Sequence, residues 1–368
     1  MERVRFEDIV TRVNTREDRF NTDKIYYVGG EHIESNDIKV HQRGIIKGST
    51  IGPMFYCGFK AGDVLFVTRN PHLRKCAIVD FDGICSEKTF VLGTKDPSRL
   101  LREYLPLIMQ SDDFWAYCEE NKSGGVNFFV NWSTLANYEF DLPSLDEQKV
   151  LADKLWAAYE VKESYKNLLA KTDKLLHAQF EKIFGDAEST PLHEVCDIIM
   201  GSSPDSSTYN TDGNGLPFYQ GKTEFGEMYV ENPTIYCSQP IREAEQNDIL
   251  MSVRAPVGAV NFAIEHCCIG RGLCSIRAKE ETTEQLFVFY ALKIQESEIE
   301  RLGTGSTIKC INKEQVHKIP IPKCDKNTQR EFVRIAEQSE KTKASLNKGI
   351  EAIEAVIRSL IAEGTTKA

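Results

Sequence analysis

Three short segments have residue types that could take part in chemistry, and none of them completes a catalytic motif. Asn-Pro occurs at 70–72 (Asn-Pro-His) and at 232–234 (Asn-Pro-Thr). An adenine methyltransferase holds its flipped base in an Asn-Pro-Pro-aromatic loop, and both segments lack the second proline and the aromatic residue. The segment 303–307 (Gly-Thr-Gly-Ser-Thr) could cradle a phosphate, but it does not match the G-x-x-x-x-G-K-[ST] loop. The sequence therefore predicts neither base methylation nor nucleotide hydrolysis by this chain.

Histidines and cysteines also fail to form a recognisable site. The 7 histidines, including His72, His193 and His317, are scattered, and no His, Cys, Asp or Glu constellation has catalytic spacing. The 11 cysteines are odd in number, include the adjacent pair Cys267-Cys268 and show no C-x-x-C spacing. This pattern indicates neither a disulfide framework nor a zinc site. We expect no metal and no catalytic residue, and an independent hydrolase is the least supported class.

The sequence contains an internal repeat, in which one unit occurs twice. Residues 62–71 (Gly-Asp-Val-Leu-Phe-Val-Thr-Arg-Asn-Pro) correspond to 247–256 (Asn-Asp-Ile-Leu-Met-Ser-Val-Arg-Ala-Pro). Further matches continue along the chain. These pair 6–10 with 192–196, 25–29 with 217–221, Asn131 with Asn312, Leu135 with Val316, and Gln148 with Gln329.

Each unit has the same predicted order of elements. Short apolar runs separated by Gly, Asn, Asp and Pro come first and predict strands with turns. A proline-free segment with apolar residues at helical spacing follows; in the second copy Leu346, Ile350, Ile353, Ile357 and Leu360 alternate steps of 4 and 3 residues. We therefore predict a first domain at 1–143, a first long helix at 144–185, a second domain at 186–323 and a second long helix at 324–364.

The length of the helices favours pairing between them. At ~1.5 Å per residue, a helix of about 40 residues runs roughly 60 Å, which exceeds the width of a domain of this size. Two copies of a unit related by a two-fold axis would bring the helices together antiparallel. The alternative is that each helix packs on its own domain. The expected fold class is α+β: two tandem mostly-β domains, each followed by a long helix, with the helices paired as an antiparallel coiled coil of pseudo-two-fold symmetry.

Four segments, in this order, add a resemblance to a known family. They are 141–148 (Asp-Leu-Pro-Ser-Leu-Asp-Glu-Gln), 201–204 (Gly-Ser-Ser-Pro), 254–258 (Arg-Ala-Pro-Val-Gly), and 303–308 (Gly-Thr-Gly-Ser-Thr-Ile) followed by Asn312. With the doubled layout, and over essentially the whole chain, the sequence resembles the specificity (S) subunits of type I restriction-modification systems. The segment 141–148 is similar to the family's proline-rich lead-in to its first conserved helix.

The resemblance implies separate roles for the two domains, the two helices and the partner subunits. The two globular parts would be target recognition domains, each binding one half of a bipartite sequence in double-stranded DNA. The helices would set the spacing and dock two methyltransferase subunits, which bind S-adenosylmethionine and methylate adenine at N6. Motor-nuclease subunits would join for cleavage. This chain itself would bind no cofactor and supply no chemistry.

The net charge is an objection to DNA binding. Lys and Arg number 45 against 55 Asp and Glu, which gives −10, whereas duplex-binding domains normally have a basic footprint. The objection weakens if partner subunits neutralise phosphates, or if charges are segregated, as in the cluster Arg3, Arg5, Arg12, Arg16, Arg19 and Lys24. We expect weak DNA binding by the isolated chain. The acidic balance also suits an alternative, a pseudo-symmetric coiled-coil adaptor that binds proteins and has no role on DNA.

Candidate DNA contacts are side chains that can bond base edges or phosphates from loops. In the first domain these are Arg69, Asn70, Lys122, Ser123, Asn127 and Asn131, and in the second Gln220, Lys222, Arg254, Arg271, Ser306, Thr307 and Lys309. Arg69 and Arg254 occupy equivalent places, which favours a shared structural role or phosphate contact over base recognition. The candidates for contact with partner subunits are Trp156, Tyr159 and Phe180, each of which could instead close the intramolecular seam. We expect Tyr26, Tyr27, Phe218 and Tyr219 in the core.

Composition indicates a cytoplasmic protein. A hydrophobic fraction of 41% in 368 residues is enough for two cores of ordinary size. No apolar run is long enough for a bilayer and no amino-terminal signal pattern is present, so we expect no membrane partner.

If the helices hold two DNA-binding domains on one side of B-DNA, the half-sites should lie roughly 34–36 Å apart, with a gap on the order of 5–8 base pairs. Inserting a heptad in one helix would then alter the gap and leave both half-sites unchanged.

Overall fold

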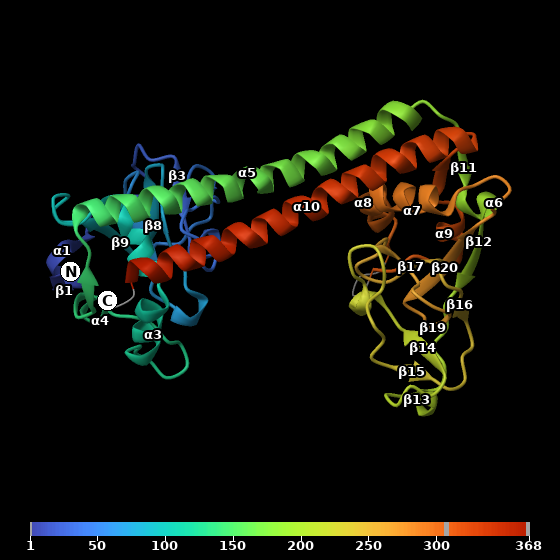
Figure 1. Ribbon diagram of the computed structural model, residues 1–368, viewed down its shortest axis with the longest axis horizontal. Coiled ribbons are helices and arrows are strands. Elements are labelled where there is room, and N and C mark those ends of the chain that lie inside the picture. The colour runs from blue at the N-terminus through green and yellow to red at the C-terminus, as the bar shows by residue number, and fades with distance from the viewer. Residues whose placement is uncertain (1, 305–308, 366–368) are drawn as a thin grey trace. The chain divides into compact units, whose positions relative to one another are not determined.

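The computed structural model describes residues 2–304 and 309–365, and the chain divides into two compact units (Figure 1). Unit 1 comprises Met1–Lys166 and Asn347–Ala368, and unit 2 comprises Asn167–Leu346. The long helices α5 (Leu145–Phe184) and α10 (Lys326–Thr365) each begin in one unit and end in the other. Each unit therefore contains a globular domain together with a part of both helices.

Unit 1 is built from short strands with four short helices. Its strands are β1 (Glu2–Arg5), β2 (Val10–Val13), β3 (Tyr26–Val28), β4 (Gly44–Ile45), β5 (Phe55–Phe59), β6 (Val64–Val67), β7 (Cys76–Ile78), β8 (Gly83–Ser86), β9 (Thr89–Thr94) and β10 (Glu139–Leu142). Its short helices are α1 (Phe6–Ile9), α2 (Leu105–Gln110), α3 (Asp112–Glu120) and α4 (Trp132–Ala136), with 3-10 turns at Gly30–His32, Pro71–Leu73 and Arg102–Tyr104.

Unit 2 repeats this order. Its strands are β11 (Ser189–Pro191), β12 (Cys196–Met200), β13 (Tyr209–Asn210), β14 (Leu216–Tyr219), β15 (Tyr236–Cys237), β16 (Glu243–Ala244), β17 (Ile249–Ser252), β18 (Val260–Phe262), β19 (Cys267–Ile269), β20 (Leu273–Ala278) and β21 (Pro320–Pro322). Its short helices are α6 (Leu192–Val195), α7 (Gln285–Ile294), α8 (Glu296–Arg301) and α9 (Lys313–His317), with 3-10 turns at Ser206–Thr208 and Lys222–Glu224.

The sheets of the two units have matching topologies. The four-stranded sheet β2-β9-β6-β7 of unit 1 corresponds to β12-β20-β17-β18 of unit 2, and the pair β1-β10 corresponds to β11-β21. The second sheets, β4-β3-β8-β5 and β13-β15-β14-β19-β16, each contain a parallel pair, β3 with β8 and β14 with β19. The internal repeat in the sequence is therefore a repeat of the fold.

The segment that is repeated most clearly in the sequence forms the central strand of each unit. All four residues of β6 are buried: Val64 and Phe66 face a core shared with the helices, while Leu65 and Val67 face the core between the two sheets. In unit 2, Ile249 and Met251 of β17 likewise face the core shared with the helices. A strand covered on both faces has a continuous apolar sequence, which explains why these runs do not alternate.

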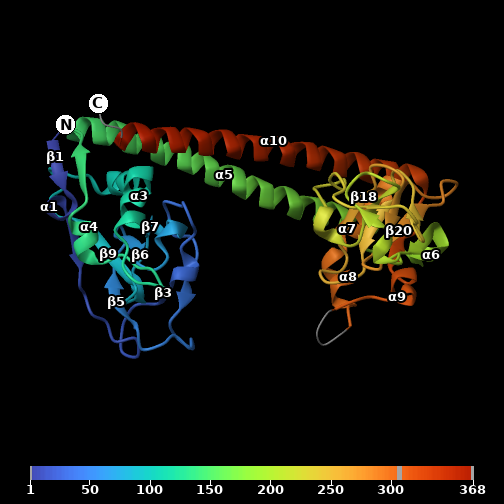
Figure 2. The same cartoon turned by 90° about the horizontal axis from the view of Figure 1, so that it is seen from below.

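Helices cover the outer face of each four-stranded sheet. In unit 1, the rings of Phe66 on β6 and Trp115 on α3 stack at 5.5 Å, and Figure 2 shows α3 beside β6 and β7. In unit 2, Phe289 of α7 stacks on Phe262 of β18 at 4.4 Å. On the other side of α7, Phe287 meets Phe332 of α10 edge-on. α7 thus lies between the sheet and the long helices.

α5 and α10 run antiparallel within each unit. In unit 1, Leu151 lies against Gly364 and Tyr165 against Gly349. In unit 2, Lys343 bonds Asp173 at 3.0 Å, and the rings of Phe180 and Phe332 lie 5.3 Å apart. The predicted antiparallel pairing of the two helices is therefore found in both units.

A buried glutamine ties the start of each long helix to its domain. Gln148 accepts a hydrogen bond from the amide of Leu101 at 3.0 Å and donates to the carbonyls of Arg99 and Pro143. Gln329 repeats the arrangement with the amide of Glu284 at 2.8 Å and the carbonyls of Thr282 and Cys324. Both side chains are fully buried and satisfied, so the first turn of each helix is fixed to the loop before α2 or α7.

Candidate nucleic-acid interface

The structure gathers the six candidates of unit 1 around one hairpin. Residues 123–129 form this first hairpin, closed by backbone hydrogen bonds in both directions between Ser123 and Phe129. The amide of Asn70 donates to the carbonyl of Phe128 at 3.0 Å, which places the hairpin beside the loop after β6. We call this set, Arg69, Asn70, Lys122, Ser123, Asn127 and Asn131, the first polar edge.

Four of these side chains hold the hairpin. Asn131 donates to the Ser123 hydroxyl at 3.0 Å. The guanidinium of Arg69 lies over the Phe129 ring at 5.8 Å, and Lys122 pairs with Glu119 at 2.6 Å. Asn70 and Asn127 are exposed, and no side-chain hydrogen bond caps the 3-10 turn that Asn70 precedes. Asn70 and Asn127 are therefore the members of the edge best placed to meet a ligand.

Unit 2 has the equivalent frame. Thr304 and Cys310 exchange backbone hydrogen bonds at 3.0 Å in each direction, and Arg254 pairs with Cys310 as Arg69 pairs with Phe129. The amide of Ala255 donates to the carbonyl of Lys309 at 2.9 Å. Ser306 and Thr307, two of the predicted DNA contacts, lie outside the described residues.

The remaining candidates of unit 2 adjoin this frame. The amide of Gly272 donates to the carbonyl of Gln220 at 3.2 Å. The carbonyl of Gly272 accepts a hydrogen bond from the amide of Val253 at 2.9 Å. These bonds connect the Gln220 and Arg271 loops to the strand end that carries Arg254. Gln220, Lys222, Arg254, Arg271 and Lys309 are all exposed, and we call them the second polar edge.

Sequence reasoning missed two residues beside the first polar edge: Val126, whose side chain is exposed, and Lys88, whose carbonyl supports Thr68. Val126, at the tip of the hairpin, has an exposed fraction of 91%. The carbonyl of Lys88 accepts both the amide and the hydroxyl of Thr68, and the carbonyl of Thr68 accepts the amide of Val130. A hydrophobic residue between Gly and Asn gave no signal as a ligand contact, and Lys88 lies far from the hairpin in sequence.

Two predicted partner contacts need correction. Tyr159 and Phe180 are buried in the cores of their own units, with exposed fractions of 3% and 6%, so neither side chain is available to another subunit. Trp156 is partly buried and donates from Nε1 to the carbonyl of Glu103 at 2.9 Å. An apolar seam on a long helix does not show whether its side chains pack within the chain or against another subunit. Here Tyr159 and Phe180 pack within the chain.

Of the aromatic residues expected in the core, Phe218 and Tyr219 are buried, and Tyr26 and Tyr27 are half-buried.

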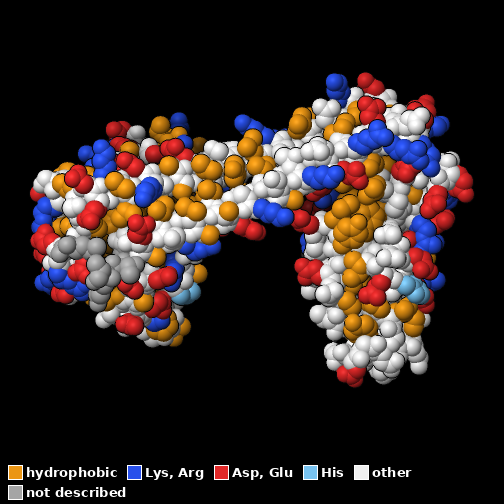
Figure 3. Space-filling model, in the orientation of Figure 1, with side chains coloured by type: hydrophobic (Ala, Val, Ile, Leu, Met, Phe, Trp, Pro, Cys, Tyr) orange, Lys and Arg blue, Asp and Glu red, His pale blue; other side chains and the backbone are white. Residues whose placement is uncertain are grey.

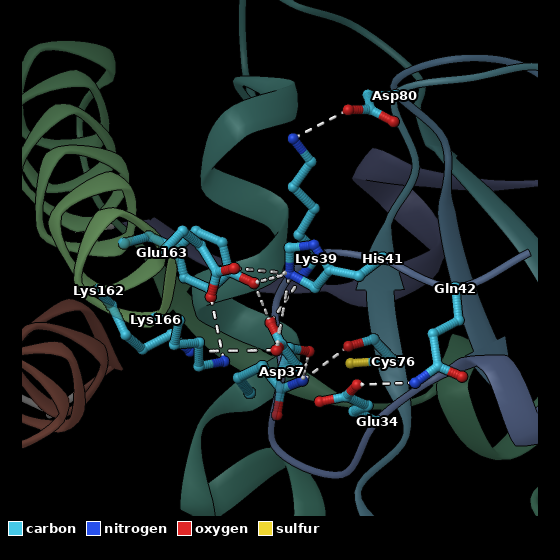
Figure 4. A network of polar contacts seen from close by, with 12 residues as sticks. Glu34, Asp37, Lys39, His41, Gln42, Cys76, Asp80, Lys162, Glu163 and Lys166 are labelled. Atoms are coloured by element: carbon cyan, nitrogen blue, oxygen red, sulfur yellow. Dashed lines mark hydrogen bonds and ion pairs between the residues drawn. The ribbon is translucent and has the colours of Figure 1, made fainter. Parts of the chain in front are cut away.

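A polar network fixes the first domain to α5 (Figure 4). The Tyr159 hydroxyl donates to the buried carboxylate of Asp37, and His41 Nε2 lies 2.7 Å from the same hydroxyl, so His41 donates to it. Burial, together with the Asp37 carboxylate, raises the pKa of Tyr159, which keeps the phenol protonated as the donor. Lys162, with a side chain 8% exposed, lies 4.0 Å from Asp37 and over the Tyr159 ring. This network orients the domain on its helix and is distant in sequence from the first polar edge.

The described surface carries both signs of charge. Figure 3 shows Lys and Arg side chains intermingled with Asp and Glu over both units on the face in view. Exposed arginines of unit 1 stack on aromatic rings, as in Arg16 over Tyr56 at 5.0 Å and Arg43 over Tyr26 at 4.1 Å. Stacking holds a guanidinium plane in one orientation, which favours paired hydrogen bonds to a phosphate or to guanine.

Metal-binding clusters and membrane-spanning helices are both absent from the described residues. Among them, no group of three His, Cys, Asp or Glu side chains is placed to hold a metal ion. Within the same residues, no helix is both long enough and apolar enough to cross a bilayer.

Comparison with known proteins identifies the family. Residues 185–355 match the family model described as the type I restriction modification DNA specificity domain. A curated relative from Methanocaldococcus jannaschii, the MjaX specificity subunit of a type I restriction enzyme, is 30% identical over 349 residues, which cover 85% of this chain and 76% of the relative.

Solved structures agree with this match. One chain, from a study of complex assembly and conformational transition in the type I R-M system, superposes with a TM-score of 0.68 at 29% identity and covers 99% of this chain and 97% of its own length. The S subunit of a type I restriction-modification system from M. genitalium has the same fold, with a TM-score of 0.60 at 16% identity and coverage of 100% and 96%. The doubled domain-and-helix fold, the family model and the curated relative together show that this chain belongs to the specificity subunits of type I restriction-modification systems, the non-catalytic subunits that carry the DNA specificity domains.

Proposed function

We propose that the chain selects a bipartite site in double-stranded DNA, with one half-site bound at each polar edge. The observation that carries the proposal is the pair of equivalent frames, Ser123/Phe129 with Arg69 and Thr304/Cys310 with Arg254, which present different exposed side chains. A shared frame with a variable face is what two domains of common fold need in order to bind different sequences.

The two kinds of residue have different tasks in this proposal. Arg69 and Arg254 have equivalent places, so they support the hairpin frame and contact phosphates, which carry no sequence information. The exposed residues that differ between units contact base edges in the major groove: Asn70 and Asn127 in unit 1, and Gln220, Arg271 and Lys309 in unit 2. Lys122, Ser123 and Asn131 act by holding the hairpin, and Lys222, Ser306 and Thr307 remain candidate contacts of the second half-site.

The partners follow from the family. We infer that the long helices dock two methyltransferase subunits, which bind S-adenosylmethionine and methylate adenine, and that motor-nuclease subunits join the assembly. With Tyr159 and Phe180 buried, the docking surface must use other side chains. In unit 2, Leu168 and Leu175 of α5 lie one heptad apart with exposed fractions of 46% and 59%, and we assign them to this contact.

The docking assignment predicts the effect of a double charge substitution. Leu168→Glu with Leu175→Glu should abolish co-purification of the methyltransferase because it places two carboxylates in an apolar interface, while the thermal unfolding temperature stays unchanged because both side chains are exposed. The matched control is Lys174→Glu, an exposed position on the same helix. Full co-purification of the double variant would contradict the assignment of this surface.

A map of N6-methyladenine tests the DNA-binding role. The chain and its methyltransferase would be co-expressed in a host without adenine methylation, and the genome sequenced for the modified base, with and without this chain. We expect methylation at one bipartite motif with a fixed gap, and only when the chain is present. Methylation that is independent of the chain would contradict the proposal and favour the protein-binding adaptor. Chain-dependent methylation at a continuous motif would contradict recognition of two half-sites.

A further inference from the structure

The tip of the first hairpin presents an apolar side chain to solvent. Val126 is 91% exposed, the highest value among the large hydrophobic side chains of the described chain. Removing such a side chain from water on contact with a ligand is favourable, so this position gains from an apolar partner surface. Its neighbour Asn127 is also exposed and offers an amide donor and acceptor.

The hairpin holds these two residues in place. Ser123 and Phe129 exchange backbone hydrogen bonds of 2.8 and 2.9 Å, and Asn70 and Thr68 tie the returning strand to the loop after β6. Lys122, whose ammonium lies 4.4 Å from the centre of the Phe128 ring, packs against the base of the hairpin. A tip fixed in this way loses little conformational freedom when it binds.

Glycines leave the leading half of the tip without side chains. Gly124 has φ +99°, and a Cβ there would lie 2.6 Å from the carbonyl oxygen of Asn127, so this place requires glycine. A Cβ on Gly125 would meet no atom within 4 Å, so the backbone there is open to an approaching surface. Val126 and Asn127 are therefore the first side chains of the tip that a ligand meets.

The chemistry of the pair selects one type of base pair. In the major groove, asparagine bonds N6 and N7 of adenine, and apolar side chains pack on the C5 methyl group of thymine. An A·T pair presents both groups, whereas a G·C pair has neither the methyl group nor the adenine donor-acceptor pattern. Side chains that wedge between base steps are larger ones such as Phe, Leu and Met, so the short valine favours the methyl contact.

We propose that Val126 and Asn127 recognise A·T pairs at one step of the first half-site, with the Asn127 amide on adenine N6 and N7 and the Val126 methyl groups on a thymine C5 methyl. Arg69, beside the same hairpin, supplies positive charge for a flanking phosphate. The inference rests on the proposed function and specifies the ligand of its first edge.

The test uses the complex of the chain with its methyltransferase subunits and duplexes that contain the target from the methylation map. Each thymine of the first half-site is replaced in turn by uracil, which removes only the C5 methyl group, and each adenine by 7-deazaadenine, which removes N7. Binding is measured by fluorescence anisotropy at one fixed salt concentration. We expect one uracil position to weaken binding about fourfold, the effect of one buried methyl group, and one deazaadenine position at or next to it to weaken binding about fivefold or more.

Two variants assign these effects to the tip. Val126→Ala should bind the thymine duplex more weakly and lose its sensitivity to uracil at that one position; Asn127→Ala should lose sensitivity to the deazaadenine. Val356→Ala, an exposed valine on α10, is the control and should behave as the wild type. Both tip side chains are exposed, so unfolding temperatures should be equal across the set.

Several results would overturn the inference. They are a first half-site without an A·T pair, a wild type insensitive to every uracil, and a Val126→Ala variant that keeps the uracil sensitivity. The proposed function fails separately, through the absence of a bipartite motif in the methylation map. A bipartite motif in the map, together with tip variants that keep the uracil and deazaadenine sensitivities of the wild type, would refute this inference alone.

Discussion

Asp63 and Asp248 occupy equivalent positions and have the same structural task. Asp63 accepts the amide of Lys60 at 2.8 Å, and Asp248 accepts the amide of Glu245 at 2.9 Å. Each carboxylate thus closes a four-residue turn that leads directly into the central strand of its unit. The carboxylates that the repeat preserves therefore support the fold, whereas the proposed function assigns base contacts to residues in which the copies differ.

Gln329 provides a test of this view at the scale of one side chain. Gln329→Ala would leave the amide of Glu284 and two buried carbonyls without partners, so the free energy of unfolding should fall by about 1–3 kcal/mol. Denaturant titration measures the change. Gln338→Ala, an exposed glutamine on the same helix, is the matched control and should lie within about 0.5 kcal/mol of the wild type. Equal losses for both variants would show that the tether contributes nothing specific.

The sequence could pair Gln148 with Gln329 but could not give their role. Their partners are backbone groups in loops of no recognisable pattern, such as Arg99, Leu101 and Thr282. The same limit applies to the first polar edge. The candidates were chosen by residue type, and only the fold shows that Asn131 bonds the Ser123 hydroxyl, whereas Asn127 lies beside the tip of the hairpin.

At the scale of the element, both long helices begin with a capped first turn. Ser144 and Glu147 form a reciprocal capping box: the Ser144 amide donates to the Glu147 carboxylate at 2.9 Å, and the Glu147 amide donates to the Ser144 hydroxyl at 3.4 Å. Asp325 precedes α10 and accepts from the amides of Asn327 and Thr328.

The helical spacing of apolar residues in the sequence predicted that these two helices exist and pair. It could not decide which apolar side chains face a partner subunit, because Tyr159 and Phe180 belong to the same seam that closes each unit.

The cap of α10 predicts a pH dependence of stability. Hydrogen bonds from the backbone and hydroxyl of Thr328 lower the pKa of Asp325, so the folded state favours the ionised carboxylate. Its contribution is therefore complete above the ordinary pKa of aspartate and declines as the pH falls through the lowered value. Asp325→Ala should unfold at a lower temperature than the wild type at neutral pH, and the difference should shrink as the pH is lowered below about 4.

Thermal scans between neutral and acidic pH measure this difference. Asp186→Ala, an exposed aspartate just after α5, is the control, and its difference from the wild type should be small at every pH. A destabilisation by Asp325→Ala that grows as the pH falls would contradict the capping account.

At the scale of the molecule, each unit contains a part of both helices, so their lengths can change only together. The boundaries between the units fall after Lys166 in α5 and after Leu346 in α10. Because the helices pair antiparallel, one heptad inserted at both places preserves the contacts within each unit. The insertion in one helix alone, which the sequence suggested, would shift the pairing and is replaced here by the double insertion. Seven residues add about 10 Å of helix, or roughly three base pairs of B-DNA.

The double insertion should therefore lengthen the gap of the bipartite motif and leave both half-sites unchanged. The N6-methyladenine map of the variant complex reports both properties at once. A change in the half-site bases, with the gap constant, would contradict the role of the helices as the spacer.

The central claim, that each domain selects one half of the target, is tested most directly by exchanging residues 1–143 for the matching domain of a specificity subunit with a different known target. The donor should keep an acid opposite Tyr159, because the Asp37 contact crosses the junction. The methylation map of the chimera should show one new half-site, that of the donor, with the other half-site and the gap unchanged. A chimera that folds and methylates but changes both half-sites, or neither, would contradict the claim.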